Sequence, residues 1–218
     1  MDRSLLSHYL SDKGTFRCGW GGDYIDTAFE TLPSEFISFA EKDLQSTFDH
    51  KYINALSNAK RALDCQADRL LKLFGYYKEA QDKFWGFPKK LEIIQKFEII
   101  APRILNKINK TRNLMEHQYI KPNTAQVEDF LDIVSLFIAS TDHYASKFVS
   151  DIDYINETNK DFDSFLEVSF KVDNLNEKLI IKTNLHKPKS KRIKIEIKKT
   201  DPEYIDIFKK HLKKTEFR

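Results

Sequence analysis

The clearest fold signal is the stretch Ser57-Asn-Ala-Lys-Arg-Ala-Leu-Asp-Cys-Gln-Ala-Asp-Arg-Leu-Leu71, which is apolar on one helical face and densely polar on the other. Upstream of it, apolar residues recur at steps of three and four from Phe36 to Phe48. Pro33 is a suitable helix start, and Gly75 is a suitable C-terminal cap. This segment is therefore predicted to form either one long helix or two helices with a break near Asp49.

The chain beyond this segment predicts further helices. A turn is expected at Trp85-Gly86-Phe87-Pro88. Pro102 then restarts a helix, because proline is tolerated in a first helical turn. The next helix, about residues 124–149, is clearly amphipathic. The predicted helices span about residues 88–100, 102–119 and 124–149.

After Tyr154 the spacing of apolar residues changes from about 3.6 to about 2, which favours strands. The connections between the alternating runs are short and turn-like, so neighbouring strands are expected to pair antiparallel. Pro202 opens a last amphipathic helix. Residues 160–218 are therefore predicted to form a three-stranded meander plus one helix, with strands near residues 166–172, 179–185 and 192–198.

The first 33 residues have no clear period, although a short helix near 2–10 is predicted. Four glycines between Gly14 and Gly22 favour a structured loop after it. The expected fold class is therefore mainly α. It comprises the N-terminal helix and loop (1–33), an antiparallel helical bundle (34–150) and a small C-terminal α+β extension (160–218).

Composition narrows the class of protein. Hydrophobic residues make up 41% of the chain and charged residues 32%, and 17 Phe argue against disorder. No stretch approaches the ~20 apolar residues of a membrane helix, and the start has no signal-peptide core. Cys18 and Cys65 fit neither a disulfide framework nor a zinc pattern. Two isolated thiols favour a cytoplasmic location.

Basic residues concentrate in the C-terminal segment. Residues 160–218 carry 16 Lys/Arg and 10 Asp/Glu, whereas residues 1–159 carry 20 and 23. Three interpretations of this surface are open. It binds nucleic-acid phosphates, it is an ordinary solvated surface, or its charges prevent an edge strand from pairing with another strand. The candidate nucleic-acid-binding residues are Lys187, Lys189, Lys191, Arg192, Lys194 and Lys198.

The best chemical candidate is the run Arg112-Asn-Leu-Met-Glu-His117-Gln-Tyr119, since the chain has no Gly-rich phosphate loop and no zinc-protease or serine-hydrolase motif. On a helix, Asn113 and His117 share one face, roughly 40° apart, whereas Arg112 lies roughly 140° from His117. Guanidinium and imidazole groups suit phosphodiester chemistry, the first by stabilising charge and the second by moving a proton. Taken alone, the run also fits an ordinary polar helix end.

The run Arg-Asn-x-x-x-His-x-Tyr resembles the Arg-x4-6-His signature of HEPN proteins. In its longer form, Arg-x4-His-x-Tyr, it resembles the HEPN toxins that are paired with minimal nucleotidyltransferases. The likeness covers about residues 34–150. It implies that Arg112 and His117 are the catalytic pair of a metal-independent ribonuclease and that Asn113 is the accompanying polar residue. It implies that Tyr119 is the tyrosine that a partner nucleotidyltransferase adenylylates. The C-terminal extension departs from small HEPN toxins and puts that partner in doubt.

The family also implies a homodimer with two motifs facing each other across a composite cleft, and no cofactor. The sequence therefore predicts a metal-independent RNA endonuclease in a toxin–antitoxin or phage-defence setting. The alternative is a HEPN-like module that binds nucleotides or a partner protein and cuts nothing.

Overall fold

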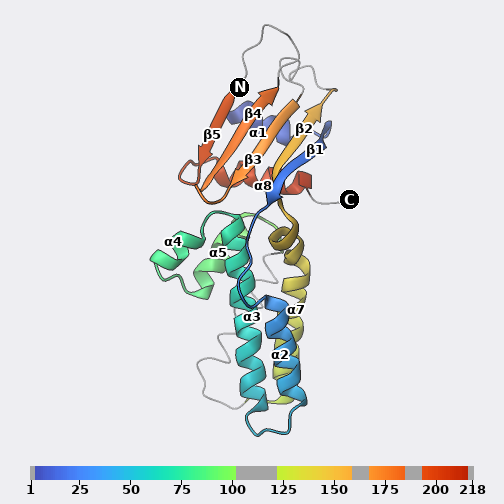
Figure 1. The fold of residues 1–218 in the computed structure, drawn as a ribbon, viewed down its shortest axis with the longest axis vertical. Coiled ribbons are helices and arrows are strands. Elements are labelled where there is room, and N and C mark those ends of the chain that lie inside the picture. Colours follow the sequence, from blue (N-terminus) through green and yellow to red (C-terminus); the bar gives the residue numbers. More distant parts are fainter. Residues whose placement is uncertain (1–2, 102–121, 159–166, 185–192, 216–218) are drawn as a thin grey trace. The chain divides into compact units, whose positions relative to one another are not determined.

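The computed structural model describes residues 3–101, 122–158, 167–184 and 193–215. Within these residues the chain is α+β, with helices and a five-stranded antiparallel sheet (Figure 1). The chain divides into two compact units. One joins Met1–Ile25 to Phe148–Arg218 and holds the sheet, and the other is Asp26–Lys147 and is helical. The helical unit is thus inserted in sequence between the first two strands of the sheet.

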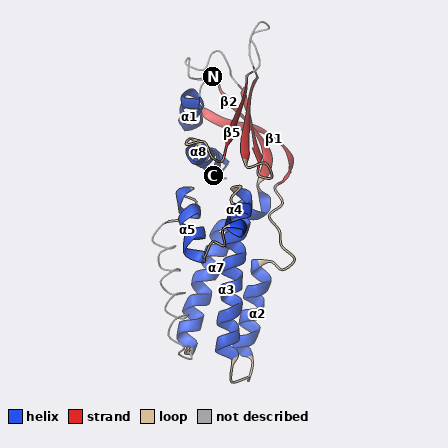
Figure 2. Ribbon diagram, turned by 90° about the vertical axis from the view of Figure 1, so that its left-hand side faces the viewer, coloured by secondary structure: helices blue, strands red, loops and turns tan. Residues whose placement is uncertain are grey.

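The sheet runs in chain order, each strand pairing antiparallel with the next. Helices α1 and α8, from the two ends of the chain, lie on one face of it (Figure 2). The elements are α1 (Arg3–Ser11), β1 (Thr15–Tyr24), β2 (Val149–Asn156), β3 (Glu167–Asp173), β4 (Lys178–Asn184), β5 (Lys194–Lys198) and α8 (Tyr204–Thr215).

The core of the sheet unit lies between the strands and these two helices. Because side chains alternate across a strand, every second residue points to the helix-bearing face. Cross-strand partners on that face are buried, as Ile152, Phe170 and Ile181 show. Leu6 and Phe208 cover them from α1 and α8 and are fully buried.

The expected fold class, mainly α with a three-stranded meander, is wrong. The three predicted strands are present as β3, β4 and β5, and the predicted last helix is α8. However, residues 15–24, expected as a loop, form strand β1, and residues 149–156 form β2. These two strands extend the meander to five. A loop was expected because the segment is rich in glycine. In the structure the strand accommodates these glycines with two register shifts, at Arg17/Gly19 and Gly21/Tyr24.

The helical unit is organised around α3, its most extensively buried described helix, which packs against α2, α4, α5 and α7. Small side chains such as Ala55, Ala59 and Ala62 are fully buried on α3 and allow close approach of its neighbours. The helices are α2 (Pro33–Gln45), α3 (Lys51–Leu73), α4 (Tyr77–Asp82), α5 (Phe87–Lys96) and α7 (Thr124–Lys147). Of the two predicted alternatives, one long helix or two with a break near Asp49, the structure has the second, because α2 and α3 are separate helices.

Helix ends follow local sequence signals. Gly75 has φ +73° at the end of α3, and the Tyr76 N–H donates to the Leu71 carbonyl at 2.8 Å, which is a Schellman-type cap. At the start of α7, the Gln126 N–H donates to Asn123 Oδ1 at 2.9 Å, and the Asn123 N–H donates to Gln126 Oε1 at 3.1 Å. This reciprocal pair is a capping box. No helix in the described ranges is long and apolar enough to cross a membrane.

Candidate functional site

The predicted catalytic run lies outside the described residues. Arg112, Asn113, His117 and Tyr119 all fall within residues 102–121, between α5 and α7. Of the predicted nucleic-acid-binding residues, Lys187, Lys189, Lys191 and Arg192 also lie outside the described part of the chain. Lys194 and Lys198 are described, and both lie on β5.

The described part of the basic cluster is partly charge-compensated. Lys194 Nζ lies 2.6 Å from Glu196 Oε1, and Lys178 Nζ lies 3.1 Å from Glu196 Oε2. Hydrogen bonds from Lys194 and Lys178 lower the pKa of Glu196 to about 2. A lysine that already faces a carboxylate offers less net charge to a phosphate. Glu196 therefore compensates part of the positive charge of Lys178 and Lys194, and this face of the two strands is not purely basic.

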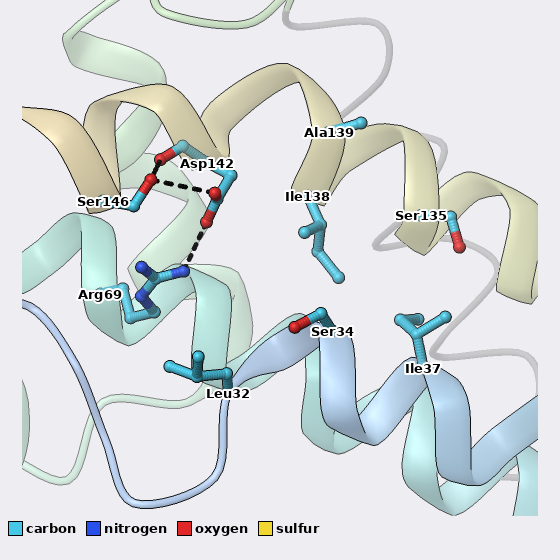
Figure 3. Close-up of a pocket in the computed structure, with 9 residues that line it drawn as sticks. All are labelled: Leu32, Ser34, Ile37, Arg69, Ser135, Ile138, Ala139, Asp142 and Ser146. Carbon is cyan, nitrogen blue, oxygen red and sulfur yellow. Dashed lines mark hydrogen bonds and ion pairs between the residues drawn. The ribbon is translucent and has the colours of Figure 1, made fainter.

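The described helices line an open cavity of about 400 Å³ within the helical unit, a volume in the range of small-molecule sites. In Figure 3, α2 and the preceding residue Leu32 form one wall, and α7 forms the other. Ile138 points from α7 into the space between the two helices. The lining residues are Leu32, Ser34, Ile37, Arg69, Ser135, Ile138, Ala139, Asp142 and Ser146, and we call this cavity the α2–α7 groove.

A buried arginine stands at one end of the α2–α7 groove. Arg69 of α3 is 5% exposed, and its Nη1 donates to Asp142 Oδ1 at 2.6 Å and to Gln66 Oε1 at 3.1 Å. The Gln66 amide donates to the Thr141 hydroxyl at 2.9 Å, and that hydroxyl donates to the Phe137 carbonyl at 2.7 Å. This chain of hydrogen bonds fixes the guanidinium, as a buried charge requires.

The carboxylate of Asp142 completes the polar end of the groove. Ser146 Oγ donates to Asp142 Oδ2 at 3.0 Å, while the Asp142 side chain remains 45% exposed. Among the described residues, Arg69 Nε is buried without a hydrogen-bond partner. Arg69 and Asp142 are the only charged residues in the described part of the groove lining, and their charges cancel. The polar end thus suits a neutral group with hydrogen-bonding atoms.

Sequence reasoning did not single out this cluster, although a signal exists. Gln66 lies three and four residues after Leu63 and Ala62, so it falls on the apolar stripe of α3. Arg69 follows three residues later and continues the same stripe into the interior. A polar pair on an apolar helical stripe predicts a buried hydrogen-bond network. Its partner Asp142 was not identifiable, because it comes from α7, far away in the chain.

A second buried ion pair lies on a different side of α3. Lys90 Nζ of α5 is 2.7 Å from Asp68 Oδ1, and both side chains are largely buried. Burial raises the pKa of Asp68, and the hydrogen bond from Lys90 opposes that rise. The pair is enclosed and joins α3 to α5, so we assign it to packing rather than to chemistry. In the described ranges, no three His, Cys, Asp or Glu side chains gather as a metal site.

Comparison with protein-family models, with curated proteins and with solved structures finds no match to this chain. The resemblance to HEPN proteins therefore rests on the residues of the sequence alone.

Proposed function

We propose that this protein is a metal-independent RNA endonuclease of the HEPN type that acts as a homodimer, in a toxin–antitoxin or phage-defence setting. The observation that carries the proposal is the run from Arg112 to Tyr119, which combines a guanidinium, an amide and an imidazole within one helical turn or two. Its context supports the proposal, because the run lies in sequence between α5 and α7 of a compact helical unit.

In the proposed reaction the ribose 2′-hydroxyl attacks the adjacent phosphorus. His117 takes the 2′-hydroxyl proton or gives a proton to the departing 5′-oxygen, and Arg112 stabilises the charge that develops on the phosphoryl oxygens. Asn113 positions one of the reacting groups. The bond from phosphorus to the 5′-oxygen breaks, which leaves a 2′,3′-cyclic phosphate and a 5′-hydroxyl. The separation of roughly 140° between Arg112 and His117 on an ideal helix favours a cleft to which two chains contribute.

The test is cleavage of RNA by the purified protein in the presence of a chelator. Arg112→Ala and His117→Ala should each reduce the cleavage rate by about 10²-fold or more, because each removes a charge stabiliser or a proton carrier. His143→Ala, at an exposed position of α7, is the matched control and should cut like the wild type. Undiminished cleavage by His117→Ala, with a normal melting curve, would refute the proposed site.

A second candidate function is a binding module, and the α2–α7 groove favours it. The walls supply Leu32, Ile37 and Ile138 for an apolar or planar body, and the Arg69–Asp142 end supplies hydrogen-bonding atoms. A nucleobase has both properties, so the probes are free nucleotides and nucleosides in equilibrium dialysis. Ile37→Trp should fill the groove and abolish binding, whereas Ile53→Trp, at an exposed position of α3, should not. Binding that Ile37→Trp leaves intact would refute this site.

A further inference from the structure

The edge strand β1 differs from the opposite edge of the sheet. Strand β5 alternates charged residues, Lys194, Glu196 and Lys198, which is a common protection of an edge against pairing. Strand β1 has ten residues and only two charges, Arg17 and Asp23. It instead exposes three aromatic side chains: Phe16 is 53% exposed, Trp20 68% and Tyr24 64%. Within the described residues, β1 pairs with β2 on one side only.

The sequence of β1 is complementary to itself when reversed about Trp20. In an antiparallel pair of two β1 strands centred on Trp20, residues whose numbers are equally far from 20 stand opposite each other. Phe16 then faces Tyr24 of the second copy, and Arg17 faces Asp23 of the second copy. Each of these pairs occurs twice, once on either side of the two-fold axis. Gly19 and Gly21, also opposite each other, leave the centre open around the two Trp20 side chains.

The faces of the sheet agree with this register. Phe16 pairs with Ile155 and Tyr24 with Val149, positions that point away from α1 and α8, so the two aromatic rings lie on the same face. Trp20 pairs with the buried Ile152, and Arg17 pairs with the buried Tyr154, so both point to the other face. The guanidinium of Arg17 lies 5.2 Å from the centre of the Trp20 ring. Cross-strand aromatic and opposite-charge pairs are the contacts that stabilise antiparallel sheets.

The irregularities of β1 fit the same symmetry. Its two register shifts relative to β2 fall between Arg17 and Gly19 and between Gly21 and Tyr24, one on each side of Trp20. Gly22 has φ +72°, and a Cβ there would lie 2.2 Å from the Ser150 hydroxyl, so this position requires glycine. In the antiparallel pair, the first register shift of one β1 strand lies opposite the second register shift of the other β1 strand. The bends that the two shifts cause therefore match along the two paired strands.

From these observations we propose that two copies of this chain pair through their β1 strands, antiparallel and centred on Trp20, to form one continuous ten-stranded sheet. A C2 interface must be self-complementary, with each residue i facing j and each j facing i. The Arg17–Asp23 pairs supply this complementarity in charge, and the Phe16–Tyr24 pairs supply it in shape. The proposal does not depend on ribonuclease activity.

The first test is a charge swap read by sedimentation equilibrium. Arg17→Asp and Asp23→Arg each place like charges opposite one another twice per dimer, and each should weaken dimerisation about tenfold or more. The double variant restores opposite charges in exchanged positions and should dimerise within a few fold of the wild type. A wild type that stays monomeric at micromolar concentration, or a double variant no better than the single ones, would overturn the proposal.

The second test reads the register itself. In a Cys18→Ser background, Trp20→Cys places two thiols opposite each other at the two-fold axis, at the separation of facing residues in an antiparallel pair, which a disulfide spans. Mild oxidation should then link the dimer covalently. Phe84→Cys, at a residue 92% exposed in the helical unit, is the control and should not link. If the charge variants still dimerise and position 20 does not cross-link, the two chains associate through a different surface. That result would also refute the proposal.

Discussion

At the scale of single residues, the buried histidine of the sheet unit is surrounded by aromatic rings. His211 of α8 is fully buried, and its ring stacks on Phe170 with the centroids 3.8 Å apart. Its Nδ1 lies 2.8 Å from the Tyr154 hydroxyl, and Nε2 has no partner among the described residues. Burial lowers the pKa of His211 to about 3, because a charged imidazolium would lose its hydration among aromatic rings.

We expect this histidine to make the stability of the sheet unit depend on pH. The pKa of an unfolded histidine is about 6.5, so between that value and about 3 the unfolded state binds a proton that the folded state does not. The contribution of neutral His211 to the free energy of unfolding is complete above about pH 6.5 and is lost as the pH falls below that value. The free energy of unfolding then decreases with a limiting slope of about 1.4 kcal/mol per pH unit. Urea unfolding at several pH values measures it, with Trp20 fluorescence in a Trp85→Phe background.

The variant His211→Asn retains an acceptor near the Tyr154 hydroxyl and cannot take up a proton. It should lower stability at neutral pH, since the stacking on Phe170 is lost, and it should flatten the dependence on pH below about 6.5. His8→Asn on α1 is the control and should retain the wild-type slope. An unchanged slope in His211→Asn would mean that another group carries the acid sensitivity.

The buried polar residues of the two units were not predicted, although the sequence holds a signal for some of them. Gln66 and Arg69 were readable as polar residues near an apolar helical stripe, but their partners Thr141 and Asp142 come from another helix. The burial of His211 could not be predicted from the sequence, because histidine is often exposed and the spacing of residues in α8 does not show that the sheet covers it. The run from Arg112 to Tyr119 stays a prediction, since it lies outside the described residues.

At the scale of elements, periodicity found the strands whose alternation is regular. Strands β3 and β4 bury every second residue, and their sequences alternate accordingly. Strand β2 begins two residues after the end of α7, with no turn residue between them, so its start was merged with the preceding helix. Strand β1 has no alternation to read, because its bulges and glycines interrupt it. Pairing with a distant strand decided its structure, which is tertiary context overriding local sequence.

One side chain joins three of these elements, and its removal should be costly. Asn156 at the end of β2 is fully buried, and its Nδ2 donates to Asp12 Oδ1 at 2.9 Å and to Thr15 Oγ1 at 2.8 Å. It therefore ties β2 to the turn after α1 and to the start of β1. Asn156→Ala removes the donor to the buried Thr15 hydroxyl and one of the two donors to Asp12 Oδ1, the other being the Gly14 N–H. It should lower the free energy of unfolding by about 2–3 kcal/mol.

The measurement is urea unfolding followed by Trp20 fluorescence. Asn176→Ala, in the exposed turn between β3 and β4, removes hydrogen bonds to Asp173 and is the matched control. It should cost less than about 1 kcal/mol, because water replaces the lost partner. Equal losses in the two variants would argue against a structural role for the buried network around Asn156.

At the scale of the whole molecule, the chain is one unit inserted into another. The buried residues of the sheet unit come from both ends of the sequence, since α1 and β1 precede the insertion and the other elements follow it. Arg3 of α1 forms ion pairs with Asp201 at 2.8 Å and with Glu203 at 2.9 Å, next to α8. Reading the sequence as consecutive domains could not reveal this arrangement, because neither end segment contains a complete core.

The insertion leaves from two neighbouring points. Tyr24 pairs with Val149, and the Ile25 N–H donates to the Phe148 carbonyl at 2.9 Å, so the ends of β1 and β2 already lie side by side. A two-residue Asn-Gly turn that joins residue 25 to residue 148 converts β1 and β2 into a hairpin, because such turns match the twist of paired strands. The helical insertion can then be removed without lengthening any connection.

We expect the shortened chain, residues 1–25 joined to 148–218, to fold by itself. It should unfold cooperatively in urea, and His211 should keep its low pKa in an NMR titration, because every aromatic ring that contacts it is retained. Residues 148–218 alone are the control and should not fold, since they lack α1, β1 and the buried side chains of Leu6, Tyr9 and Leu10. A shortened chain that unfolds without cooperativity, or whose His211 titrates near 6.5, would show that the sheet unit requires the helical insertion.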